Sequence, residues 1–129
     1  MTRRSTARYL CSEMVRIEWQ DHRGALNTSG ILEEIWPEGA SVQTLGPIQA
    51  GTKLWIVAKR ALFLGTVTEC RFIRDGYFSR VAFASESRWS ARSFRPEHMV
   101  NTQTIFARWL KESLTTLESP KARSAGSGT

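Results

Sequence analysis

Hydrophobic and polar residues alternate along most of the first two-thirds of the chain. After residue 12, Val15, Ile17 and Trp19 fall on one face of an extended segment, and charged or amide side chains fall on the other. A period of two is typical of a half-buried β-strand. The turn residues Asp21 to Gly24 end this first segment.

Five further segments have the same character, and turn residues separate them. Asp75-Gly76 predicts a two-residue hairpin turn, because both central positions of such a turn need positive φ. No helical pattern intervenes, which favours an antiparallel barrel or sandwich, and closure into a barrel removes exposed strand edges. The predicted strands cover residues 13–20, 25–36, 40–44, 53–58, 61–74 and 77–84.

The pattern changes after Ser85. Residues 85–100 are predicted to be an ordered connector, with Asn101 as the N-cap of an amphipathic helix over about 102–118. This helix either packs on its own barrel or supports a dimer or a partner contact. Its apolar stripe consists of Ile105, Phe106, Trp109, Leu110, Leu114 and Leu117. The pattern alone therefore indicates an all-β fold, an antiparallel barrel or sandwich, with a C-terminal α-helix. The chain divides into a flexible basic arm (1–12), barrel and connector (13–100), helix (101–118) and disordered tail (119–129).

Length and charge narrow the class of protein. A chain of 129 residues is expected to form one domain. It carries 18 basic and 12 acidic residues, a net charge of +6, which permits an anionic partner without requiring one. No apolar run reaches the length of about 18 residues that a membrane span needs, and no signal peptide is recognised. We expect a cytoplasmic protein, whose oligomeric state the sequence leaves open.

Few residues suggest catalysis. His22 and His98 fall in a turn and in the connector, where solvated surface groups are the expectation, and Cys11 and Cys70 are expected to be small buried hydrophobes. The spacing of these residues matches no metal motif, and no nucleophile motif occurs. We therefore predict a binding or regulatory module that is not an enzyme and has no metal or cofactor.

Two short constellations suggest binding. Arg4 and Arg8 stand four residues apart on the basic arm, where two guanidinium groups can meet phosphates or guanine edges. The second constellation runs from Glu34 through Trp36 to Gly39, where a strand ends, turns and restarts. The alternatives are a disordered basic terminus and an ordinary strand–turn–strand corner.

Together these features resemble the PilZ domain, a bacterial family of six-stranded barrels that bind cyclic di-GMP. The family pattern is an RxxxR arm followed by a strand that ends in (D/N)xSxxG. Arg4-Ser5-Thr6-Ala7-Arg8 matches the first part, and Glu34-Ile35-Trp36-Pro37-Glu38-Gly39 aligns with the second. The resemblance continues through 47–54, 65–67 and 81–83. It implies an all-β fold, a six-stranded antiparallel PilZ-like β-barrel with a C-terminal α-helix, and cyclic di-GMP as ligand. The candidate ligand-binding residues are Arg4, Arg8, Glu34, Trp36 and Gly39.

Two positions depart from the family pattern. Glu34 replaces the short acid or amide, and Trp36 replaces the serine, so that the indole either fills the ligand pocket or offers a base a stacking face. Three hypotheses follow: a cyclic di-GMP receptor whose arm orders over the ligand, a degenerate PilZ-like adaptor that binds an unidentified protein, and a basic barrel that binds single-stranded nucleic acid. The third is the least favoured, because most of the tryptophans fit apolar faces of predicted elements.

Overall fold

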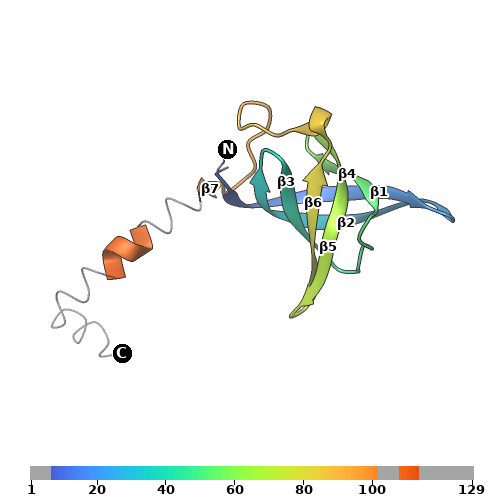
Figure 1. Ribbon diagram of the computed structural model, residues 1–129, viewed down its shortest axis with the longest axis horizontal. Helices are drawn as coiled ribbons and strands as arrows, with labels where there is room; N and C mark the ends of the chain where they lie inside the picture. The colour runs from blue at the N-terminus through green and yellow to red at the C-terminus, as the bar shows by residue number, and fades with distance from the viewer. Residues whose placement is uncertain (1–6, 102–107, 114–129) are drawn as a thin grey trace.

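The computed structural model describes residues 7–101 and 108–113. The first of these ranges forms a closed six-stranded antiparallel β-barrel, so the predicted fold class is confirmed (Figure 1). The elements are β1 (Tyr9–Asp21), β2 (Gly24–Trp36), β3 (Gly39–Thr44), β4 (Lys53–Ala58), β5 (Ala61–Ile73), β6 (Gly76–Phe83), the 3-10 turn η1 (Ser85–Ser87) and β7 (Val100–Asn101).

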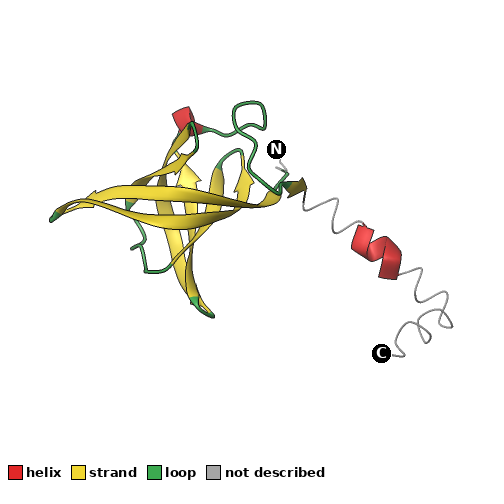
Figure 2. Ribbon diagram, turned by 180° about the vertical axis from the view of Figure 1, so that it is seen from behind, coloured by secondary structure: helices red, strands yellow, loops and turns green. Residues whose placement is uncertain are grey.

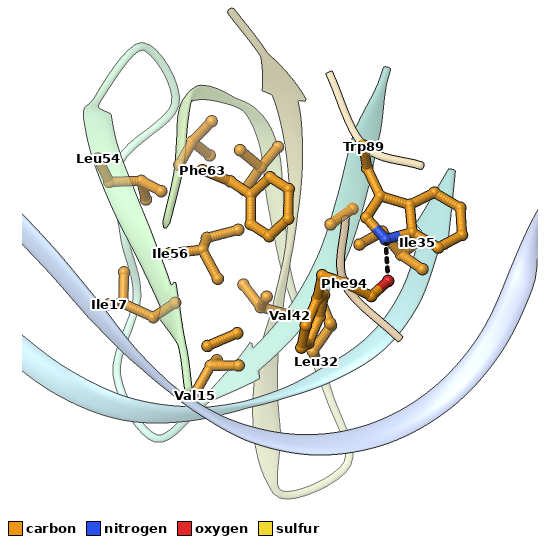
Figure 3. Packing of buried hydrophobic residues seen from close by; sticks show 14 of the residues in the cluster. Val15, Ile17, Leu32, Ile35, Val42, Leu54, Ile56, Phe63, Trp89 and Phe94 are labelled. Atoms are coloured by element: carbon orange, nitrogen blue, oxygen red, sulfur yellow. Dashed lines mark hydrogen bonds between the residues drawn. The ribbon is translucent and has the colours of Figure 1, made fainter. Parts of the chain in front are cut away.

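The strand order in the sheet is β2-β3-β6-β5-β4-β1-β7, and an additional β1–β2 pairing closes the barrel. Each strand places alternate side chains inward, which is why the predicted period of two recurs in the burial pattern. The inward side chains form one apolar core (Figure 3). Its largest fully buried members include Ile17, Leu32, Ile35, Leu54 and Ile56.

The β1–β2 and β5–β6 hairpins extend beyond the barrel (Figures 1 and 2). β4 pairs with β1 only along Arg16–Trp19, and with β5 only along Ala61–Thr66. The distal half of β5 therefore continues past the point where β4 begins, whereas β1 ends two residues after its last pair with β4.

The segment after β6 packs back onto the barrel. Trp89 and Phe94 are both buried in the core cluster, and the Trp89 indole Nε1 donates a hydrogen bond of 2.7 Å to the Phe94 carbonyl oxygen (Figure 3). β7 then pairs with the start of β1, through Leu10 and Val100 among others. The connector thus contributes to the core as well as linking elements.

Two boundaries differ from the sequence expectations. The predicted arm was to end at residue 12, but β1 begins at Tyr9, because Tyr9 and Leu10 pair with both β2 and β7. Asn101 lies in β7, and helix is described only for residues 108–113. The remainder of the predicted helix and the predicted tail 119–129 lie outside the described residues.

The β5–β6 turn is displaced by one residue from the predicted Asp75-Gly76 pair. Ile73 pairs with Gly76, so Arg74 and Asp75 form the two-residue loop, and Arg74 takes the positive φ of 59°. Gly76 itself has no positive φ, so the turn does not require glycine at this position. It lies against the flexible Gln43 side chain, whose Nε2 atom would be 2.5 Å from an added Cβ.

The part of the chain described by the structure contains no helix long and apolar enough to cross a membrane.

Candidate functional site

Four of the five predicted site residues are described, and they gather at one end of the barrel; Arg4 lies outside the described residues. The Arg8 guanidinium nitrogen NH1 lies 3.7 Å from the Glu34 Oε2 atom. The Arg8 Cζ atom lies 4.2 Å from the centroid of the Trp36 ring. One guanidinium thus contacts both residues that depart from the family pattern.

Strand register explains this convergence. Tyr9 pairs with Ile35 and Leu10 with Glu34, which carries the residue before β1 alongside the end of β2. The β2–β3 hairpin then brings Gly39 opposite Trp36. Residues separated by about 25 positions in the sequence therefore share one outer surface of the barrel.

Gly39 has a steric role in this corner. A Cβ atom at this position would lie 2.4 Å from the Val81 carbonyl oxygen and 2.9 Å from the Trp36 Cζ2 atom. Both distances are shorter than real Cβ contacts allow. The absence of a side chain lets β3 approach β6 and lets the indole lie across the strand.

Trp36 has only 8% of its surface exposed. The sequence left open whether its ring fills the site or offers a stacking face. With Arg8 above it and the Gly39 backbone beside it, the indole occupies the corner. A base could stack on it only after the Arg8 guanidinium moves aside.

Arg80 is a neighbour that sequence reasoning missed. Its Cζ atom lies 5.7 Å from the centroid of the Trp36 ring. Alternation along residues 77–84 does predict that Arg80 points outward. Its proximity to Trp36, however, depends on the pairing of β6 with β3, which are not consecutive in the chain.

Two groups next to the candidate site, the Glu33 carboxyl and the Cys11 thiol, have raised pKa values. Burial raises the pKa of the Glu33 carboxyl above its ordinary value. Burial, together with the nearby charges of Glu13, Glu34 and Glu33, raises the pKa of the Cys11 thiol to about 12. Cys11 also packs against the core, and its sulfur lies 3.5 Å from the Leu32 carbonyl oxygen. Such a thiol is protonated and unreactive at neutral pH.

The connector holds the corner in place. The Trp89 backbone N–H donates to the Pro37 carbonyl oxygen at 3.0 Å, and the Arg88 guanidinium lies 3.0 Å from the Glu38 carboxylate. The Trp89 ring also meets the Tyr9 ring edge-on, with centroids 5.5 Å apart. Trp89 therefore contacts both segments that carry the candidate site, through its ring at Tyr9 and through its backbone N–H at Pro37.

The remaining candidate groups lie apart from this corner. His22 and His98 are exposed, and Cys70 is a half-buried free thiol that packs against the core. Within residues 7–101 and 108–113, no group of three or more His, Cys, Asp or Glu side chains is placed to hold a metal ion. The chain matches no protein-family model and no curated protein sequence.

Proposed function

We propose that this chain is a PilZ-like regulatory domain that binds cyclic di-GMP at the corner formed by Arg8, Glu34, Trp36 and Gly39. The observation that carries the proposal is the convergence of these four residues from two separate sequence motifs. The proposal rests equally on the resemblance of those motifs to the family pattern. The six-stranded barrel is compatible with it.

Each side chain suits a part of the ligand. A guanidinium group can donate two hydrogen bonds to a phosphate or to the O6 and N7 atoms of guanine, which matches Arg8. The Glu34 carboxylate can accept from the guanine N–H groups. The Trp36 ring can stack on a base, with a contribution of about 1–3 kcal/mol per base.

The ion pair between Arg8 and Glu34, which a ligand must displace, is weak. The Arg8 and Glu34 side chains are 39% and 21% exposed, and their nearest charged atoms are 3.7 Å apart. Partly exposed ion pairs of this kind contribute about 0–1 kcal/mol. A phosphodiester that takes over the Arg8 guanidinium therefore replaces a small interaction by a charge-assisted one. Release of Arg8 also uncovers the indole for stacking.

The test is isothermal titration of the full chain with cyclic di-GMP, in parallel with Arg8→Ala. We expect the wild type to bind at tens of micromolar or tighter, and Arg8→Ala to bind at least tenfold more weakly. Arg16→Ala is the control, since Arg16 lies on the same strand, is exposed and pairs with Glu18. No binding by the wild type at these concentrations would overturn the proposal.

A second candidate function is a protein-interaction adaptor that has lost the nucleotide. The burial of Trp36 favours it, because an indole that is 8% exposed already fills the space where the family has a small hydroxyl. In this case the closed corner is a structural feature and the partner binds elsewhere.

The double variant Glu34→Asp, Trp36→Ser separates the two candidates. If the adaptor reading is right, restoring the family residues creates or greatly strengthens cyclic di-GMP binding that the wild type lacks. If the receptor reading is right, the wild type binds without the change. A double variant that folds but still ignores the nucleotide would remove degeneration at these positions as the explanation.

A further inference from the structure

We propose that Arg80 and Ser41 extend the candidate site across β3 onto β6, so that Arg8 and Arg80 together hold the phosphate groups of its ligand. This inference rests on the proposed function for the identity of the nucleotide. It adds two contact residues that lie outside both sequence motifs.

A row of paired residues carries the inference. Glu34 pairs with Ser41 on β3, and Ser41 pairs with Arg80 on β6. Paired residues on neighbouring strands lie on the same face of the sheet, with strands about 4.8 Å apart. Glu34, Ser41 and Arg80 therefore form a continuous polar row on the outer face of the barrel.

The row faces solvent. Ser79 and Val81, which flank Arg80, are 1% and 0% exposed and point into the barrel, whereas Arg80 is exposed. Glu69 on β5 pairs with Arg80 in the strand register, but the Glu69 carboxylate is engaged by Arg71 Nε at 3.1 Å. Among the residues that the structure describes, Arg80 forms no ion pair, so its charge is available to an anion.

Arg8 and Arg80 share one reference point, the Trp36 ring. Their Cζ atoms lie 4.2 Å and 5.7 Å from its centroid, so the two guanidinium groups are at most about 10 Å apart. Two cations within this reach can contact one dinucleotide simultaneously. Arginine suits the task because its planar fork binds phosphate through two parallel hydrogen bonds.

Ser41 supplies a hydroxyl that the corner otherwise lacks. The serine of the family pattern is Trp36 here, so no hydroxyl is available at that position. Ser41 is half-buried between Glu34 and Arg80 in the row, and its hydroxyl can both donate and accept. We expect it to hydrogen-bond the ligand beside the two arginines.

The experiment is a pair of titrations of the full chain, one with cyclic di-GMP and one with inorganic pyrophosphate as a probe of the two arginines alone. Arg80→Ala should weaken the binding of both ligands at least tenfold, and Arg80→Lys should retain part of the affinity because it keeps the charge but loses the fork. Ser41→Ala should weaken only cyclic di-GMP. Arg16→Ala, which removes an exposed arginine of β1 that pairs with Glu18, should change neither affinity by more than twofold.

The outcomes distinguish the two claims. If the wild type binds cyclic di-GMP and Arg80→Ala binds as tightly as Arg16→Ala, this inference is wrong and the proposed function stands. If pyrophosphate binds in an Arg80-dependent manner while cyclic di-GMP does not bind, the arginine pair is supported and the proposed function fails. If neither ligand binds the wild type, both are overturned.

Discussion

The two ends of the β1–β2 hairpin differ in how they are held. At the candidate-site end, the connector packs Trp89 and Phe94 into the core and hydrogen-bonds the Pro37 carbonyl. At the opposite end, the hairpin borders an open groove of about 910 Å³ between β1, β2 and the start of β4. Trp19 lines this groove half-buried, and Trp55 lines it with 42% of its surface exposed.

This difference shows where the geometry of the candidate site originates. Arg8 sits at the start of β1, and Tyr9 beside it packs on Trp89 and pairs with Asn101. The position of the arginine thus depends on residues about 80 to 90 positions away in the chain. At the groove end β1 also pairs with β4, but the tip of the hairpin beyond Trp19 is held by the local pairs Gln20–Ala25 and Asp21–Gly24. We call the candidate-site end the closed end and the groove end the open end. Substitutions at the closed end should therefore lower the free energy of unfolding strongly, and those at the open end only weakly.

The largest effect is expected for Trp89→Ala. It removes a 97%-buried indole, its hydrogen bond to the Phe94 carbonyl and its contact with Tyr9. Large-to-small changes of this kind cost about 3–5 kcal/mol. Urea unfolding followed by circular dichroism measures the loss. Trp55→Ala at the open end is the matched control, with an expected cost of about 1 kcal/mol or less. Equal costs would contradict the contrast between the two ends.

The next effect concerns thiol reactivity at the closed end. With the pKa of Cys11 at about 12, the thiolate fraction near pH 8 is on the order of a thousandfold lower than for an ordinary cysteine. The rate of alkylation of Cys11 in a Cys70→Ser variant should fall by about that factor. The same variant in urea should react at the ordinary rate. Rapid reaction of the folded protein would mean that the start of β1 opens readily.

A smaller effect is expected for Glu13→Ala. The buried Glu13 carboxylate accepts a hydrogen bond of 2.9 Å from the Glu97 backbone N–H, and Lys59 Nζ lies 3.8 Å from its other oxygen. The variant leaves the Glu97 N–H without that acceptor, at a cost of about 1–3 kcal/mol.

Glu18→Ala is the control for this change, because Glu18 lies on the same strand in an exposed pair with Arg16. Its expected cost is about 0–1 kcal/mol. Glu13→Gln should retain most of the wild-type stability, since its amide oxygen still accepts the bond. Unfolding midpoints that rank Glu18→Ala below Glu13→Ala would contradict the role assigned to the connector.

The sequence predicted the six strands because each strand carries its own signal, and the resemblance then favoured a barrel over a sandwich. Alternation at Val15, Ile17 and Trp19, for example, depends only on which face a strand buries, and that face is read directly from a period of two. The motifs also predicted that Arg8 and Glu34 belong to one site, although through a resemblance rather than through the pattern itself.

The parts that the sequence did not predict depend on contacts between distant segments. Arg80 reaches Trp36 through the β3–β6 pairing, which joins strands that are not consecutive. Gly76 looked like a turn residue, yet it lies in β6, paired with Ile73 and packed against the Gln43 side chain of another strand. Residues 9–12 lacked alternation, and their strand structure comes from pairing on both sides.

The smallest effect lies at the open end, at the tip of the β1–β2 hairpin. The Asp21 carboxylate accepts the Arg23 backbone N–H at 2.7 Å and also lies 3.2 Å from the Arg23 guanidinium. These contacts, the backbone bond first, lower the pKa of Asp21 below its ordinary value of 3.8. The stabilisation is therefore present above that value and is lost as the pH falls through the lower pKa of the folded state.

Asp21→Asn should consequently lower the urea midpoint slightly at neutral pH, and the gap from the wild type should close in acid. Arg23→Ala should leave most of this pH dependence intact, because the backbone N–H remains and only the guanidinium is removed. A gap that stays constant across the acid range would show that the charged carboxylate does not stabilise the tip. A gap larger than that of Glu13→Ala would mean that the open end is held as firmly as the connector holds the candidate site, and the contrast between the two ends would fail.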